Sequence, residues 1–150
     1  MYLGLDLGTS GVKALLIDDK QSVIGSGTGT LDVSRPHSGW SEQDSAHWIS
    51  ATEDAIAALK ASHPKELAAV KGIGLSGQMH GATLLDGNDS VLRPCMLWND
   101  TRSHAEAAEL DGNPIFRALI GNFVFPGLTA PKVMWVKNNE PEIFAKLRRV

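Results

Sequence analysis

Residues 1–17 read MYLGLDLGTSGVKALLI, and this stretch decides the fold. Tyr2–Leu5 forms a short apolar strand that ends on Asp6, and Val12–Ile17 forms a second strand after a glycine-rich turn. A polar turn then leads into a third extended segment, Ser22–Gly29. Connections this short can only join antiparallel neighbours. The start of the chain therefore predicts an antiparallel meander of strands.

A helix and a further strand follow the meander. Asp44 is a suitable N-cap, and apolar residues recur at helical spacing until His63-Pro64 ends the pattern. Val70–Gly77 then returns as an extended segment. Because a helix separates it from the first strand, we expect the two strands to run parallel. The sequence thus predicts an α/β fold with a mixed sheet and flanking helices.

The rest of the chain predicts a hairpin and several helices. Residues Thr83–Leu92 resemble Leu15–Ile24 position by position. We interpret this as two hairpins with Asp-rich turns rather than an internal duplication. The segments after Trp98 that are helical in pattern are Ser103–Leu110, Ile115–Ile120, a helix capped by Thr129, and Glu142–Val150.

Composition excludes several classes of function. The chain has 150 residues, which fits one ordinary domain, and its net charge of -3 comes from 17 acidic and 14 basic residues mixed along the sequence. No basic stripe is present to bind nucleic acid, and no apolar run is long enough to span a membrane. The single cysteine, Cys95, cannot form an internal disulfide. Since the N-terminus has no signal-peptide pattern, we expect a cytoplasmic protein.

The turn after the first strand is the strongest chemical signal. Gly8 and Gly11 permit a tight turn whose backbone N–H groups can converge on an anion. Thr9 and Ser10 add hydroxyl groups, and Lys13 adds a positive charge. These residues predict a phosphate-binding loop, although an ordinary hairpin turn is the simpler alternative.

Asp6 favours the phosphate-binding interpretation. A carboxylate at the end of a strand is not needed for a hairpin turn, but it can hold Mg²⁺ or its waters beside phosphate oxygens. The spacing from Gly8 to Lys13 does not match a P-loop, and no helix follows. Gly72–Gly77 does match GxGxxG, but its glycines lie within a strand rather than between a strand and a helix, so a Rossmann site is not expected.

A second polar segment ends the strand predicted to lie beside the first. It places Gln78, Met79 and His80 between two glycines. Carboxyl ends of neighbouring parallel strands are where α/β folds bind ligands. A lone histidine in a loop is commonly structural, but this position favours ligand binding if the Asp6 loop binds phosphate.

A third segment, Trp98-Asn99-Asp100-Thr101-Arg102, allows two interpretations. Trp98 and Asp100 could present an aromatic face and hydrogen-bonding groups to a polyol. Equally, Asp100 or Thr101 could cap the next helix while Arg102 pairs with an acidic neighbour. We expect Trp40, Trp48 and Trp135 to be packing residues.

Taken together, these motifs resemble the FGGY carbohydrate kinases, and the resemblance covers nearly the whole chain. The segments that carry it are Met1–Lys13, Gly39–Asp44, Ser76–Gly81, Leu97–Arg102 and Thr129–Trp135. The first motif is shared by the wider actin-like ATPases. Gln78–Gly81 resembles the family members that act on D-xylulose. The resemblance implies a ribonuclease-H-like domain of the actin-like ATPase type.

The resemblance also implies a reaction, the ATP-dependent phosphorylation of D-xylulose at its 5-hydroxyl. Asp6 would act with Mg²⁺ and the phosphates, with Gly8, Thr9, Ser10 and Lys13 at the nucleotide phosphates. Gln78, Met79, His80, Trp98 and Asp100 would form the sugar site. The general base, an Asp, is expected beyond residue 150, as is the nucleotide-binding C-terminal domain.

Residues 1–150 would then be an incomplete N-terminal domain, inactive alone and prone to self-association through its uncovered apolar faces. A homodimer is also possible on this resemblance. Two other classes stay open. One is an ATPase of the actin or chaperone type, and the other is a non-catalytic sugar-binding module.

Overall fold

The computed structural model describes all residues from 1 to 150, and they form two compact units. The first unit contains Met1–Val33 and Ala46–Gln78, and the second contains Ser34–Ser45 and Met79–Val150.

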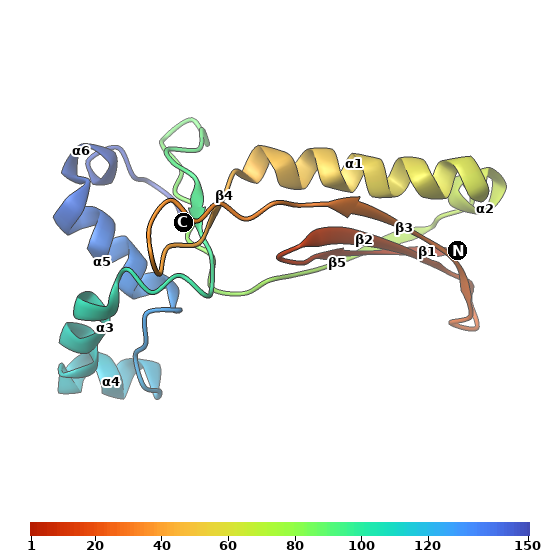
Figure 1. Ribbon diagram of the computed structural model, residues 1–150. Coiled ribbons are helices and arrows are strands. Elements are labelled where there is room, and N and C mark those ends of the chain that lie inside the picture. Colours follow the sequence, from red (N-terminus) through yellow and green to blue (C-terminus); the bar gives the residue numbers. More distant parts are fainter. The chain divides into compact units, whose positions relative to one another are not determined.

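The first unit contains the predicted mixed sheet (Figure 1). Its strands, in the spatial order β3-β2-β1-β5, are β1 (Tyr2–Leu7), β2 (Gly11–Ile17), β3 (Val23–Thr30) and β5 (Gly72–Gly77). β1 pairs antiparallel with β2 and parallel with β5, while β2 pairs antiparallel with β3. The βββαβ order and the mixed sheet are therefore confirmed.

Two helices follow β3 in this unit. α1 (Ser45–Ser62) begins directly after Asp44 and ends before His63-Pro64, as the capping and proline signals predict. A short helix that was not predicted, α2 (Pro64–Ala68), begins at that proline. Proline fits the first turn of a helix because its missing N–H would have no intrahelical partner there.

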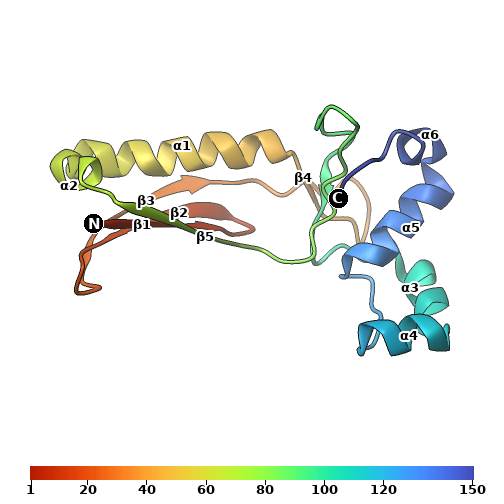
Figure 2. The same cartoon turned by 180° about the vertical axis from the view of Figure 1, so that it is seen from behind.

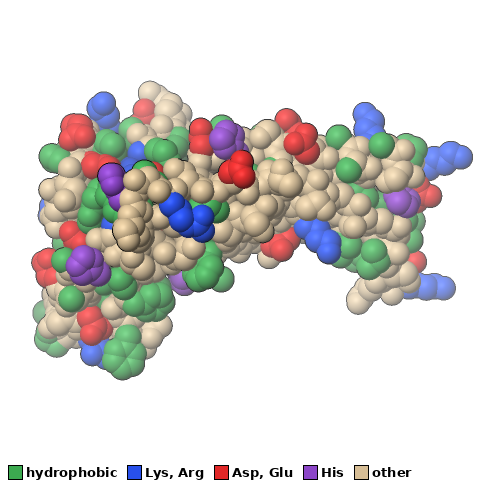
Figure 3. Space-filling model, viewed as in Figure 1, with side chains coloured by type: hydrophobic (Ala, Val, Ile, Leu, Met, Phe, Trp, Pro, Cys, Tyr) green, Lys and Arg blue, Asp and Glu red, His purple; other side chains and the backbone are tan.

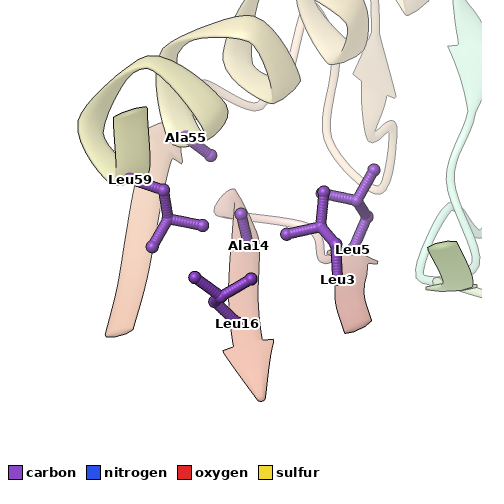
Figure 4. Packing of buried hydrophobic residues seen from close by; sticks show 6 residues of the cluster. All are labelled: Leu3, Leu5, Ala14, Leu16, Ala55 and Leu59. Atoms are coloured by element: carbon purple, nitrogen blue, oxygen red, sulfur yellow. The ribbon is translucent and has the colours of Figure 1, made fainter. Parts of the chain in front are cut away.

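α1 covers one face of the sheet in both views (Figures 1 and 2). Alternate residues of β1 and β2 point toward it, since side chains along a strand alternate between faces. The buried cluster comprises Leu3, Leu5, Ala14, Leu16, Ala55 and Leu59 (Figure 4). The intervening residues, Asp6 and Lys13 among them, consequently lie on the opposite face.

Glycines in β3 let α1 lie directly on the strand. A Cβ added to Gly27 would collide with the backbone of Ala55, and one added to Gly29 would collide with the backbone of Ala51. Any side chain at these two positions would push the helix away from the sheet.

Gly29→Ala should therefore destabilise the chain, by roughly 1–3 kcal/mol, because the added methyl group meets backbone that cannot rotate away. Urea denaturation would measure this change. Gly74→Ala in β5 is the matched control, since nothing lies within 4 Å of the Cβ it would add. Equal effects of the two substitutions would contradict the close contact of β3 with α1.

The two similar sequences 15–24 and 83–92 fold into the same turn. In each, one aspartate Oδ1 accepts from two backbone amides: those of Lys20 and Ser22 for Asp18, and those of Asn88 and Ser90 for Asp86. Gln21 and Asp89 occupy the same place in the two turns, with φ of 65° and 62°. The predicted second turn is correct, but Leu85 and Val91 form only an isolated bridge there, so the segments that flank this turn are not a pair of strands.

The second unit contains four helices and one pair of short strands. Its elements are β4 (Glu42–Gln43), β6 (Cys95–Met96), α3 (His104–Asp111), α4 (Pro114–Ile120), α5 (Thr129–Asn139) and α6 (Pro141–Phe144). β4 pairs antiparallel with β6. The buried core of this unit contains Ala82, Leu84, Met96 and Val136.

Two predictions about the helices of this unit are wrong. Thr129 is the first residue of α5 rather than its cap, which is Leu128. The helix expected over Glu142–Val150 ends at Phe144. Beyond it, the amides of Arg148 and Arg149 donate to the carbonyl oxygen of Leu85, so this segment pairs with another part of the chain instead of continuing the helix.

Acidic and basic side chains are interspersed on the face drawn in Figure 3, in line with the mixed charges of the sequence. Large apolar side chains are also exposed, among them Leu75 in β5 and Leu119 in α4. None of the helices combines the length and apolar character that crossing a membrane requires.

Candidate functional site

Backbone hydrogen bonds stabilise the turn between β1 and β2. The N–H of Gly8 donates to the carbonyl oxygen of Gly11 at 3.0 Å, and the N–H of Leu31 donates to that of Ser10 at 3.0 Å. The Gly8 N–H is therefore engaged within the turn. The hydroxyl of Ser10, which is exposed, is the group that this turn offers to an anion.

Gly8 and Gly11 are needed because a side chain would not fit at either position, and not because the backbone there is left-handed. Neither has a positive φ. A Cβ on Gly11 would lie 2.6 Å from the carbonyl oxygen of Gly29, and one on Gly8 would lie 3.1 Å from that of Gly11. Close backbone approach is thus the reason for glycine at both positions.

Asp6 is exposed on the face of the sheet opposite α1. Strand register places it between Lys13 of β2 and Ser76 of β5. All three residues line an open depression of about 410 Å³, together with Gly4, Leu5, Leu15, Gly74 and Leu75. The predicted grouping of a carboxylate with a lysine at the end of the central strand is what the structure contains.

A hydrogen bond connects the turn to the end of β5. The hydroxyl of Thr9 donates to Oε1 of Gln78 at 3.2 Å, and the N–H of Gln78 donates to the carbonyl oxygen of Leu7 at 2.9 Å. The ends of β1 and β5 are thereby held side by side, as the parallel pairing predicts. Gln78 lies in the first unit and is followed directly by Met79 and His80 in the second.

The residues around Asp6 fit a metal ion that arrives with a nucleotide better than a metal held by protein alone. No group of three or more His, Cys, Asp or Glu side chains gathers anywhere in the chain. Mg²⁺ is commonly bound by one or two carboxylates plus substrate phosphates and waters. Asp6 can supply such a carboxylate, and it is exposed enough to do so.

In the second unit, the side chains of Met79 and His80 point into solvent. Met79 is 58% exposed, and His80 is also exposed, with a φ of 62°. A non-glycine residue in this left-handed region costs roughly 1 kcal/mol or more, so the turn is held by its surroundings. The N–H of Ala82 donates to the carbonyl oxygen of Met96 at 2.9 Å, which brings this turn beside the segment that leads to the exposed Trp98.

Asp100 differs from its neighbours because it is completely buried. Its carboxylate accepts from Nε and Nη2 of Arg102, at 2.9 and 2.7 Å, and from the N–H of Ser41 at 2.7 Å. Of the two interpretations of this segment, the pairing of Arg102 with an acidic neighbour is the one the structure contains. The capping interpretation is wrong, because the N-cap of α3 is Ser103. Direct contact of Asp100 with a sugar stays a prediction that this buried arrangement does not favour.

Arg102 is the centre of a larger network. Glu42 accepts from Arg102 at 2.7 Å and from Arg93 at 2.5 Å. The guanidinium of Arg102 lies 3.6 Å from the ring centroid of Trp40, which packs edge-on against Trp135 at 5.4 Å. Trp40 and Trp135 are therefore packing residues, as expected, and the segment around Trp40 is tied to the Asp100 segment.

Lys132, a fully buried residue of α5, was not predicted from the sequence. Its Nζ donates to the carbonyl oxygens of His80 at 2.7 Å and Gly127 at 2.8 Å. Its burial could have been predicted from its position one helical turn before Val136. Because Val136 is buried, this spacing places both residues on the inward face of the helix.

Comparison with known proteins identifies the family. The profile for the N-terminal domain of the FGGY family of carbohydrate kinases matches residues 1–150. The chain belongs to this family. It is 50% identical, over its whole length, to the xylulose kinase of Escherichia coli and 49% identical to that of Klebsiella pneumoniae.

Solved structures agree with this assignment. A xyloylose kinase from Brucella ovis is 70% identical over 99% of this chain, with a TM-score of 0.97. A xylulose kinase from Rhodospirillum rubrum is 32% identical over 97% of the chain, with a TM-score of 0.89. The actin-like ATPase fold is therefore confirmed. In each case the chain spans only about a third of the relative, 31% of the E. coli protein and 30% of the R. rubrum structure.

Proposed function

We propose that this FGGY chain is the N-terminal part of a kinase that transfers the terminal phosphoryl group of ATP to D-xylulose, giving D-xylulose 5-phosphate. The observation that carries the proposal is the connection between the Gly8–Gly11 turn and the segment Gln78–His80. Thr9 of the phosphate loop is hydrogen-bonded to Gln78, and Gln78 is followed directly by the exposed pair Met79 and His80. Identity to xylulose kinases over the whole chain supports the choice of sugar.

In this proposal the Asp6 face receives the phosphates. Asp6 would hold Mg²⁺, directly or through water, and the ion would neutralise charge on the phosphates when bound. Lys13 lies on the same face and adds positive charge, while the hydroxyl of Ser10 donates to a phosphate oxygen and that of Thr9 stays bonded to Gln78. Phosphoryl transfer depends mainly on positioning and charge stabilisation, which such groups supply.

Met79 and His80 would bind the sugar. An imidazole offers a donor and an acceptor to adjacent hydroxyls, and the thioether packs against the carbon chain. Trp98 would add an aromatic face. The base that accepts the proton of the 5-hydroxyl would be an aspartate outside residues 1–150, as would most of the adenosine pocket. A cytoplasmic location and a homodimer also stay predictions.

His80→Ala tests the sugar assignment in a full-length kinase whose residues 1–150 are this sequence. We expect the KM for D-xylulose to rise by about 10- to 100-fold, because hydrogen bonds to the sugar are lost, and the KM for ATP to stay within about twofold. Steady-state kinetics with each substrate varied in turn would measure both.

Two further variants separate binding from backbone effects. His80→Asn suits the left-handed backbone of residue 80 and should still lose sugar affinity. His104→Ala, at the exposed start of α3, should change neither constant. If only the ATP constant responds to His80→Ala, the sugar assignment is wrong.

A further inference from the structure

The ammonium group of Lys132 is buried without a carboxylate partner. The side chain is 0% exposed, and none of the ion pairs in its unit includes it. Its two partners are carbonyl oxygens, of His80 at 2.7 Å and of Gly127 at 2.8 Å. Burial lowers the pKa of Lys132 to about 8, against the opposing effects of Cys95 and Asp100.

Such an arrangement is costly for stability alone. A buried charge is expensive unless it is paired, and an apolar side chain of similar volume commonly stabilises such a position at least as well. The neighbours of Lys132 in α5 already provide an apolar core, with Val136 fully buried one turn later. A lysine at this position therefore suggests a role other than filling space.

What the ammonium holds is the main chain of the turn that carries Met79 and His80. The carbonyl that accepts the shorter bond belongs to His80, the residue with a φ of 62°. The second carbonyl belongs to Gly127, in the loop that leads into α5. Gly127 also lies against the carbonyl oxygen of Trp98, so a Cβ there would collide with it. Lys132 thus ties together the turn at His80 and the loop that contacts Trp98.

We propose that Lys132 is a positioning residue for sugar binding: its buried ammonium fixes the His80 carbonyl, and so sets the direction in which Met79 and His80 present their side chains. The inference rests on the proposed function, because it assumes that these side chains bind the sugar. Lys132 does not itself reach solvent, so its effect passes through the backbone of the turn.

Lys132→Met in the full-length kinase removes the donor and keeps a similar volume. We expect the KM for D-xylulose to rise by about 10- to 100-fold, with the KM for ATP within about twofold. The melting temperature should fall only modestly, because removing the buried charge offsets part of the loss of a donor to two carbonyl oxygens. Lys132→Gln retains an N–H donor, so its KM for D-xylulose should lie between those of the wild type and Lys132→Met. Lys137→Met, on the exposed side of the same helix, is the matched control and should leave both constants unchanged.

The outcomes separate this inference from the proposed function. If His80→Ala weakens sugar binding but Lys132→Met and Lys132→Gln do not, the sugar site stands and the positioning role is refuted. If the Lys132 variants lower the melting temperature and impair both substrates equally, the lysine is merely structural and the inference is also refuted. Should Lys132→Met fail to fold, Lys132→Gln alone decides, by whether its KM for D-xylulose rises selectively.

Discussion

Asp6→Asn in a full-length kinase carrying this chain should lower kcat by about 10³-fold, on the scale found when one group that stabilises transition-state charge is removed. The substitution keeps the shape of the side chain. It removes the negative charge that a magnesium ion shared with phosphates requires. Asp6 shares its face with Lys13 and Ser76, so no second carboxylate in this depression can replace it. Initial rates at saturating ATP and D-xylulose would measure the loss.

The fold should survive this substitution, because Asp6 is exposed. The buried residues of the same strand, Leu3 and Leu5, pack on the other face of β1. Melting temperature should therefore change little. Asp54→Asn, an exposed aspartate of α1 in the same unit, is the matched control and should retain full turnover. Turnover of Asp6→Asn close to that of Asp54→Asn would remove the role assigned to Asp6.

The sheet was predictable from sequence because its signals are local. Apolar alternation in β1 and β2, short connections, and the helix before β5 determine the strand directions, and the structure has them. The end of the chain was not predictable in this way. Residues after Phe144 have a helical pattern, but the amides of Arg148 and Arg149 bond to Leu85, more than fifty residues earlier in the chain. Such long-range pairing overrides local propensity.

The position of the Gly8–Gly11 turn beside the end of β5 was likewise predictable, since the parallel pairing of β1 with β5 brings Thr9 and Gln78 together. The position of Asp100 was not. Its spacing from Arg102 allows an exposed or a buried pair, and only the packing of Trp40 and Ser41 around them selects the buried one. Lys132 was missed for a related reason. A lysine in a helix is ordinarily exposed, and the carbonyls that accept its bonds belong to residues distant in sequence or in a loop.

ATP turnover by a full-length kinase carrying this chain should depend on the sugar. Because the proposed site binds a ketose through Met79 and His80, kcat/KM should be higher for D-xylulose than for glycerol or gluconate by about 10³-fold or more. A site built to hydrogen-bond particular hydroxyls rejects compounds that lack them by such factors. Residues 79 and 80 are exposed and adjacent, as such a site requires. Coupled measurement of ADP release with each compound gives the ratio.

The most direct test of the whole account is to identify the product. The full-length kinase would be incubated with Mg-ATP and D-xylulose, and the sugar phosphate would be analysed by ³¹P NMR alongside ADP release. We predict one D-xylulose 5-phosphate formed for each ADP, with little ADP released when the sugar is omitted. ADP release at the same rate without sugar would instead indicate an ATPase of the actin or chaperone type. D-xylulose binding without any sugar phosphate would indicate a non-catalytic sugar-binding module, and either result would contradict the proposed kinase.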